Sequence, residues 1–196
     1  MELFSEGAES SLYRKDKTSL IKIREAKTYR IESIDLRLRK ERTKREAKIL
    51  EYLHQKEIHV PKLLEMKVEK EEMSITIEYL NAKVLKEVLD ETLLSKAFEE
   101  IMNMHEAEVV HGDLTTLNML TKEKDVFLID FGLSKFSKKI EDRASDLHLF
   151  FTCIKNEHPQ LFSLKKNLLE KYKLLSFGEA VVKRLENIEK RGRNKK

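Results

Sequence analysis

The hydrophobic pattern of this 196-residue chain changes its period near residue 82, and that change constrains the fold more than any other feature. Before it, short segments such as Ser74 to Leu80 alternate apolar and polar residues, as half-buried strands do. After it, apolar residues recur at spacings of three and four, as from Leu94 to His105, which is the period of a helix. Strand patterns followed by helical patterns predict an α+β fold.

The expected elements follow from these periods. Strands are expected at residues 12–14, 20–24, 64–68, 74–80 and 126–129. Helices are expected at residues 37–54, 142–154, 161–175 and 179–190. Ser176 to Glu179 fits a capping box that opens the last helix. We expect one domain, with a sheet lobe over residues 1–80, a helical lobe over 81–189 and a basic tail over 190–196.

Composition excludes several classes of protein. Charged residues make up 38% of the chain, above the roughly 25% of ordinary domains. Basic and acidic residues nearly balance at 39 and 35, and 40% of residues are hydrophobic, so the chain can bury a core and is not disordered as a whole. The single cysteine, Cys153, excludes an internal disulfide and a cysteine-based zinc site, and favours a cytoplasmic location. No apolar run approaches the ~20 residues of a membrane span.

The near-neutral total hides an uneven distribution of charge. Residues 14–48 hold 14 basic and 6 acidic side chains, a net of +8, whereas residues 65–108 hold 5 basic and 12 acidic ones, a net of −7. Five of the last seven residues are basic. The tail is either a solvated chain end or a surface for tRNA phosphates or an acidic partner. Residues 14–48 could likewise face RNA or a partner, although part of their charge belongs to the expected ATP site around Lys22.

The segment His111 to Asn118 carries the strongest chemical signal. It places Asp113 five residues before Asn118, as in the catalytic loop H-x-D-x-x-x-x-N of kinase-type phosphotransferases. Asp130-Phe131-Gly132 follows Asn118 by twelve residues. Phosphoryl transfer requires an oriented acceptor, a group that accepts its proton and a divalent metal that offsets phosphate charge. Asp113 can orient the acceptor or accept its proton, and Asn118 and Asp130 suit the binding of Mg²⁺ or Mn²⁺.

The N-terminal segment extends this comparison to the nucleotide. Ser5 to Tyr13 aligns with the kinase phosphate loop G-x-G-x-x-G-x-V-Y, although only its middle glycine is kept. Taken alone, the segment reads more simply as a polar hairpin turn. As a phosphate loop it would contact ATP through Ser5, Glu6, Gly7, Ala8, Glu9, Ser10, Ser11, Leu12 and Tyr13.

Three further positions complete the expected ATP site. Lys22 ends a segment resembling the kinase strand V-A-I-K and would contact the α- and β-phosphates, with Glu46 as its ion-pair partner. Glu78 and Leu80 flank the expected hinge, where the backbone would bond adenine. An isolated lysine or glutamate is usually only solvated, so these assignments depend on the catalytic loop.

Nearly the whole chain resembles the small kinase/ATPase subunit of the KEOPS complex, an archaeal and eukaryotic assembly linked to threonylcarbamoyladenosine in tRNA. The similarity is carried by Gly7-Ala8-Glu9, Lys22 to Arg30 (K-x-R-x-x-K-x-Y-R), Arg42 to Ala47 (R-T-[KR]-x-E-A), His111 to Asn118, Asp130 to Leu133, Glu141 to Leu147 (E-D-K-A-x-D-L) and Arg191-Gly192-Arg193. Two departures, the missing proline near Ala26 and Leu117 before the asparagine, remove no chemical group.

The resemblance implies a minimal bilobal protein-kinase-like fold whose reduced helical lobe lacks a full activation segment. Asp146 follows Gly132 by only 14 residues with no A-P-E motif between them. Gly112 stands where many regulated kinases have the arginine that pairs with an activation-loop phosphate. Asp146 is then either the buried residue that braces the catalytic loop or a solvated helix residue.

The resemblance also implies a function. It implies an atypical serine/threonine kinase or ATPase that uses ATP and Mg²⁺ or Mn²⁺, with Asp113, Lys22 and Glu46 as catalytic residues. Its expected partners are the catalytic threonylcarbamoyl-transferase subunit of KEOPS, a small regulatory subunit and, through the complex and the basic tail, tRNA. Membrane partners are not expected.

Three alternatives are weighed against this reading. A RIO-type kinase of ribosome maturation shares the H-G-D loop but usually carries I-D-x-P-Q at the metal-binding aspartate, where this chain has Ile129 to Gly132. Small-molecule kinases tend to have histidine at the position of Thr115. A non-enzymatic scaffold would not bind ATP.

Overall fold

The computed structural model describes residues 1–7 and 9–193. The chain forms two compact units, which are described separately: residues 1–81 with 131–133, and residues 82–130 with the remainder of the chain from Ser134. Strands dominate the first unit and helices the second, so the expected α+β class is confirmed. Across the described part of the chain, no helix combines the length and apolarity needed to span a membrane.

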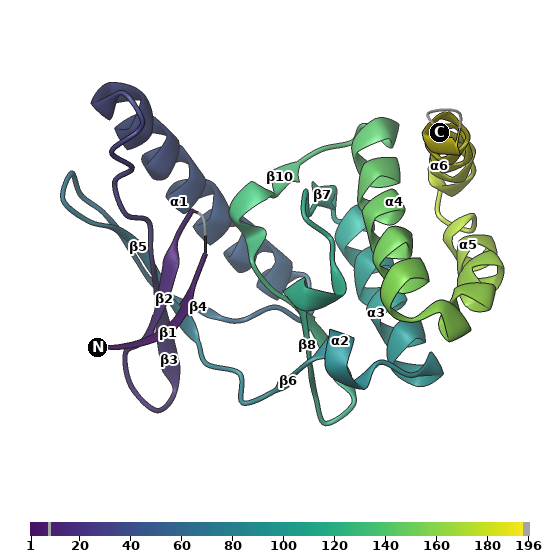
Figure 1. The fold of residues 1–196 in the computed structure, drawn as a ribbon, viewed down its shortest axis with the longest axis horizontal. Helices are drawn as coiled ribbons and strands as arrows, with labels where there is room; N and C mark the ends of the chain where they lie inside the picture. The colour runs from purple at the N-terminus through teal and green to yellow at the C-terminus, as the bar shows by residue number, and fades with distance from the viewer. Residues whose placement is uncertain (8, 194–196) are drawn as a thin grey trace. The chain divides into compact units, whose positions relative to one another are not determined.

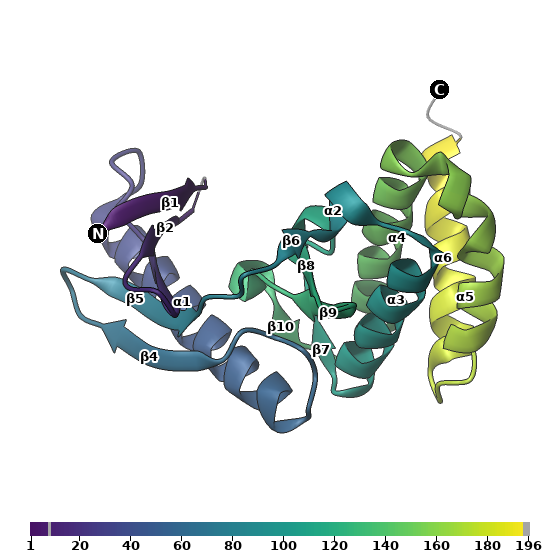
Figure 2. The same ribbon diagram turned by 90° about the horizontal axis from the view of Figure 1, so that it is seen from below.

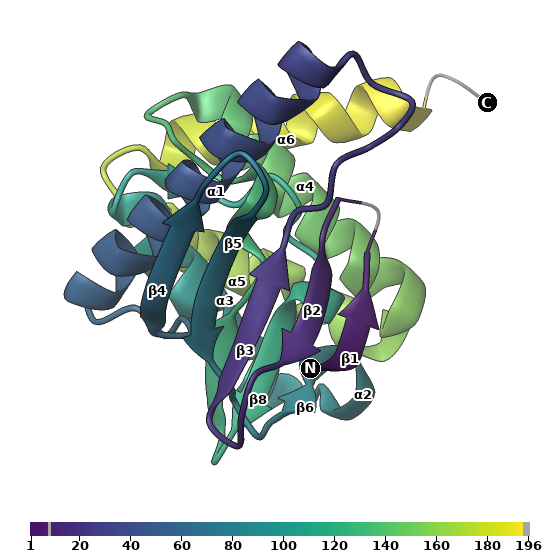
Figure 3. The same cartoon turned by 90° about the vertical axis from the view of Figure 1, so that its left-hand side faces the viewer.

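The first unit contains a five-stranded antiparallel sheet (Figure 3). Its spatial order is β1-β2-β3-β5-β4. The strands are β1 (Glu2–Glu6), β2 (Ser11–Arg14), β3 (Ser19–Ile23), β4 (Leu63–Val68) and β5 (Met73–Glu78). Strands β3 and β5 are the most buried, and both carry β-branched residues that fit a pleated surface. The sequence pattern missed β1, every residue of which is exposed.

One long helix, α1 (Glu32–Gln55), lies against this sheet (Figure 1). It begins at Glu32 rather than at the expected Arg37. Its C-terminal half buries apolar residues such as Ile49 and Leu53 together with Glu46, whereas its N-terminal half buries Asp35, Arg39 and Thr43. The helical spacing of Leu38, Arg45, Ile49 and Leu53 predicts one face, but Leu38 and Arg45 are only half-buried in the structure.

The second unit is built from helices with short strand pairs between them. Its elements are β6 (Lys83–Val84), α2 (Leu85–Val88), α3 (Glu91–Glu106), β7 (Val109–Val110), β8 (Met119–Lys122), β9 (Asp125–Leu128), β10 (Lys135–Phe136), α4 (Ile140–Glu157), α5 (Lys165–Tyr172) and α6 (Gly178–Arg193). Figure 2 shows α3, α4, α5 and α6 side by side. The unit also contains a three-stranded sheet of order β6-β8-β9 and a two-stranded sheet formed by β7 and β10.

An aromatic cluster forms the core of the second unit. Phe98 of α3 packs with ring centroids 6.3 Å from Phe150, 5.7 Å from Phe151 and 6.0 Å from Tyr172. All four side chains are almost completely buried. Asp90 begins α3 by accepting a hydrogen bond from the Leu93 amide at 2.7 Å, an ordinary N-cap. Helices α3, α4 and α5 are thereby fixed around one core.

Gly178 at the start of α6 gives a direct test of this packing. A Cβ atom there would lie 2.1 Å from the Tyr172 carbonyl oxygen, far inside van der Waals contact. We expect Gly178→Ala to lower the free energy of unfolding by about 1–3 kcal/mol, the cost of overpacking, although alanine favours helices more than glycine. Thermal or urea unfolding measures this. Glu179→Ala at the exposed neighbour serves as the control, and a stabilised Gly178→Ala would contradict the close contact.

Candidate active site

Lys22 and Glu46 meet in the first unit. The Lys22 ammonium donates to Glu46 Oε1 at 2.8 Å, and both side chains are almost fully buried. Arg24, which sequence reasoning did not assign, donates to the other oxygen, Oε2. A buried carboxylate needs such compensation, since an unpaired buried charge is costly. Glu46 on α1 therefore holds two cations that are neighbours on and just after β3.

The expected phosphate loop is a hairpin. Ser5 and Glu6 lie in β1, whereas Ser11 to Tyr13 lie in β2. The Gly7 amide donates to the Ser10 carbonyl at 3.0 Å across the turn. Ala8, also expected to contact ATP, lies outside the described residues. A polar hairpin turn and a kinase phosphate loop are compatible interpretations of this segment, because a kinase phosphate loop is itself the turn of a hairpin.

The expected hinge follows the last central strand. Glu78 ends β5, and its amide donates to the Lys62 carbonyl at 2.9 Å. Leu80 is buried two residues later. Between them, Tyr79 carries the Arg14 guanidinium 3.8 Å from its ring centroid, which fixes the tyrosine side chain on the sheet.

Asp113 and Asn118 are joined in the second unit. The Asn118 amide nitrogen donates to the Asp113 carbonyl oxygen at 2.8 Å and to its carboxylate Oδ2 at 3.0 Å. Because both amide hydrogens point to Asp113, the Asn118 Oδ1 atom remains the acceptor end of that side chain, the oxygen a divalent cation would use. The carboxylate is thereby oriented by the residue expected to bind metal.

His111 ties this loop to the strand end that carries Asp130. Its Nε2 donates to the Ile129 carbonyl at 2.9 Å, and its Nδ1 accepts from the Asp113 amide at 3.3 Å. The Ile129 amide donates to the Asn118 carbonyl at 3.0 Å. Asp130 itself has φ 61, a left-handed conformation that is uncommon outside glycine. Such strain persists only where its surroundings impose it, and it gathers at functional sites.

Asp146 of α4 is a buried brace rather than a solvated helix residue. Its Oδ2 accepts from the His111 amide at 2.6 Å, and its Oδ1 accepts from the Gly112 amide at 2.9 Å. Burial alone would raise the pKa of this carboxyl group, but hydrogen bonds from the His105 side chain and the Gly112 amide hold the pKa below its usual range. Gly112 has φ 82, a backbone conformation that an arginine would adopt only with strain.

The brace continues away from the catalytic loop. His105 Nε2 lies 3.2 Å from Asp146 Oδ2, and His105 Nδ1 lies 2.7 Å from the Tyr172 hydroxyl. Burial lowers the pKa of His105 and raises that of Tyr172, so both are neutral near pH 7. The carboxylate can only accept, so Nε2 carries the proton and the Tyr172 hydroxyl donates to Nδ1. The sequence pattern placed His105 in a helix but gave no indication of this link.

The chain between Gly132 and α4 is short. It spans residues 133–139, where β10 pairs with β7, the strand just before the catalytic loop, and the Ser134 hydroxyl donates to the His111 carbonyl at 2.8 Å. A conventional activation loop has no room in this stretch.

The candidate residues thus fall into two sets, one in each unit. Lys22 contacts Glu46, and Asp113 contacts Asn118. Among the described residues, no three His, Cys, Asp or Glu side chains gather into a metal site. A cavity of about 660 Å³ in the first unit, lined by residues 23–28 and the first half of α1, holds none of the residues expected to contact ATP.

Comparisons with known proteins agree with this geometry. The RIO domain family matches residues 8–147. The chain is 38% identical to a KEOPS complex subunit Bud32 of Pyrococcus abyssi, over 83% of this chain and 80% of that protein. It is 30% identical to a probable serine/threonine-protein kinase BUD32 homolog of Archaeoglobus fulgidus, over 89% of this chain and 87% of that protein.

Other relatives are longer. The chain is 35% identical to a probable bifunctional tRNA threonylcarbamoyladenosine biosynthesis protein of Methanobrevibacter smithii, over 97% of this chain but only 36% of that protein. It thus spans about a third of the bifunctional relatives. The alternatives weighed above are not exclusive, because a RIO-domain match and Bud32 relatives occur in the same chain. With its kinase-type catalytic loop and its shortened segment before α4, the chain belongs to the Bud32 family of RIO-domain, kinase-like KEOPS subunits.

Proposed function

We propose that the chain transfers the γ-phosphoryl group of ATP to water or to a serine or threonine hydroxyl. The observation that carries this proposal is the braced catalytic loop. Asp146 fixes the backbone of His111 and Gly112, and Asn118 fixes the Asp113 carboxylate. Asp113 would orient the attacking hydroxyl and accept its proton, and Lys22 would contact the α- and β-phosphates.

The donor set suits a bound Mg²⁺ or Mn²⁺. Asn118 Oδ1 and the Asp130 carboxylate are hard oxygen ligands of the kind both cations prefer. When bound with ATP, the metal supplies positive charge that offsets the charge developing on the phosphoryl oxygens. The left-handed backbone at Asp130 supports this role, since strain is retained where it serves binding.

The proposed setting is a KEOPS-type complex in the cytoplasm. A relative is named as a subunit of that complex, and longer relatives are named for threonylcarbamoyladenosine biosynthesis. We propose that the chain binds a threonylcarbamoyl-transferase subunit and a small regulatory subunit, and approaches tRNA with its basic end. That end continues α6 through Lys190 and Arg191, while residues 194–196 lie outside the described residues. The short segment before α4 supports a partner-dependent enzyme, because it leaves little surface for a free peptide substrate.

Single-turnover hydrolysis of ATP tests this proposal. We expect the transferase subunit to raise the rate of phosphate release by about tenfold, on the order of 1.4 kcal/mol in the barrier, because the partner supplies the specificity that this chain lacks. The rate is measured for the chain alone, for the complex, and for the chain with an unrelated protein of similar charge. A rate that the transferase subunit leaves unchanged would contradict the proposal.

A further inference from the structure

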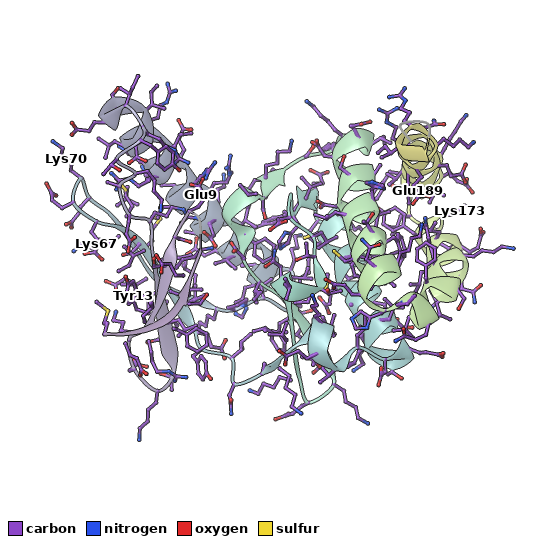
Figure 4. All side chains as sticks on the ribbon, viewed as in Figure 1. Glu9, Tyr13, Lys67, Lys70, Lys173 and Glu189 are labelled. Atoms are coloured by element: carbon purple, nitrogen blue, oxygen red, sulfur yellow. The ribbon has the colours of Figure 1, made fainter. Side chains whose placement is uncertain are left out.

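Three sequence signatures meet at one carboxylate in the first unit. Glu9 belongs to the β1–β2 hairpin, Arg30 ends the segment Lys22 to Arg30, and Arg42 opens the segment Arg42 to Ala47. Arg30 donates to both carboxylate oxygens, with Nη2 2.7 Å from Oε1 and Nη1 3.3 Å from Oε2. Arg42 Nη1 lies 2.7 Å from Oε2. Figure 4 shows Glu9 at the end of the hairpin, next to α1.

This cluster, Glu9 with Arg30 and Arg42, is a charged contact at neutral pH. The hydrogen bond from Arg30 has the largest effect and lowers the pKa of Glu9; burial opposes it, and the charges of Arg42 and Arg30 lower the pKa further. A two-oxygen contact with a planar guanidinium fixes direction as well as distance. The hairpin turn is therefore tied by one side chain to two different segments.

The cluster is connected to Lys22. Arg30 Nη1 lies 3.6 Å from Asp35 Oδ1, and Arg39 donates to Asp35 Oδ2 at 2.6 Å. Arg39 also donates to the Arg24 carbonyl at 3.4 Å, and the Arg24 guanidinium pairs with Glu46. These contacts form one path of polar groups within the first unit, from Glu9 to the carboxylate that holds Lys22.

The hairpin has a reason to need such a tie. A kinase phosphate loop places its backbone against ATP phosphates through glycines, but Ser5 and Ser10 occupy two of the three glycine positions here. Among the described residues of the turn, the Gly7 amide donates to the Ser10 carbonyl. The contacts of Glu9 add a tie from this turn to segments outside the hairpin.

We propose that Glu9, Arg30 and Arg42 are positioning residues that hold the phosphate-loop hairpin at a fixed place relative to Lys22. This inference rests on the proposed use of ATP. Its consequence is selectivity: the cluster acts on the phosphate end of the nucleotide and leaves the adenosine end unaffected. A residue that only stabilised the fold would weaken both ends alike.

A double-mutant cycle with Glu9→Gln and Arg42→Gln tests the proposal. We expect each single change to weaken binding of ATP with Mg²⁺ about threefold to tenfold, with adenosine affinity unchanged. Their combination should weaken ATP binding no further than Glu9→Gln alone, because Arg42 acts through its contact with Glu9. Glu65→Gln is the matched control, since Glu65 forms an exposed ion pair with Lys15 at 2.9 Å in the same unit. Affinities are measured by calorimetry.

Amide hydrogen exchange of the hairpin, measured without nucleotide, is the second readout. Exchange at residues 5–7 and 9–11 should quicken in Glu9→Gln but not in Glu65→Gln. The inference would be overturned, with ATP use intact, by any of three results. These are a double variant whose loss of ATP affinity is the product of the two single losses, equal losses of ATP and adenosine affinity, and unchanged amide exchange in the hairpin. A wild-type chain that bound no ATP would overturn both this inference and the proposed function.

Discussion

Replacing Asp113 with asparagine is expected to slow ATP turnover about a thousandfold, within the range of losses seen when a positioned proton acceptor is removed. Asparagine has the same shape but neither the charge nor the basicity of the carboxylate. Its amide can still meet the Asn118 side chain, which now lies 3.0 Å from Asp113 Oδ2. The loop should therefore keep its structure while the step that needs a proton acceptor is lost.

Steady-state phosphate release and nucleotide affinity, measured together, separate these effects. Turnover should fall while ATP affinity changes less than about threefold. This combination indicates that Asp113 makes an interaction only in the transition state. Asp125→Asn is the control, because Asp125 is a carboxylate of the same unit that pairs with Lys96 at 3.1 Å on the surface. Turnover that survives Asp113→Asn would remove this residue from the catalytic role.

The second large effect is expected at Asp146. Asp146→Asn replaces a buried acceptor of three hydrogen bonds with an amide that has one acceptor oxygen, leaving the His111 or Gly112 amide unpaired. We expect the free energy of unfolding to fall by about 2–4 kcal/mol, the cost of breaking a buried charged network. Turnover should fall with it, because the backbone before Asp113 loses its anchor.

The pH dependence of this loss has a defined sign. The pKa of Asp146 is lowered in the folded chain, so its contribution to stability is complete above the ordinary carboxyl pKa of about 4 and disappears as pH falls through the lowered value. The difference in unfolding free energy between wild type and Asp146→Asn should be constant near neutral pH and shrink in acid. Urea unfolding from pH 3 to pH 7 measures it. Asp142→Asn, on the same helix but paired with exposed Lys135, should cost less than about 1 kcal/mol.

Local pattern was enough to predict much of the fold. The alternation around Ile75 and the helical spacing after residue 90 each indicated the right element, and α1 and α4 differ from expectation mainly at their ends. The short strands β6, β7 and β10 have only two residues each, too few to show a period. Residues 32–36, the start of α1, were missed because this turn buries a charged residue, Asp35, which pairs with Arg30 from the preceding segment and with Arg39 of the helix itself.

Some residues of the candidate site could likewise be predicted from the sequence, and others could not. Asp113, Asn118 and Asp130 could be named because kinase-type chemistry fixes their types and spacing along the chain. The second cation on Glu46, the Tyr172 hydroxyl on His105 and the arginines on Glu9 could not, since no spacing rule relates Tyr172 to His105 across 67 positions. Such contacts support the site through space, and only the folded chain shows them.

Calorimetric titration of ATP into the chain in the presence of Mg²⁺ tests the central claim, that this chain is an ATP-using member of its family. We expect one nucleotide bound per chain. ATP affinity should fall at least tenfold in Lys22→Ala and in Asp130→Asn, since each change removes a charge that would face phosphate or metal. Omitting Mg²⁺ should weaken ATP binding by the wild type and have little further effect on ATP binding by Asp130→Asn. A wild-type chain that bound no ATP, or binding that both variants left unchanged, would contradict that claim.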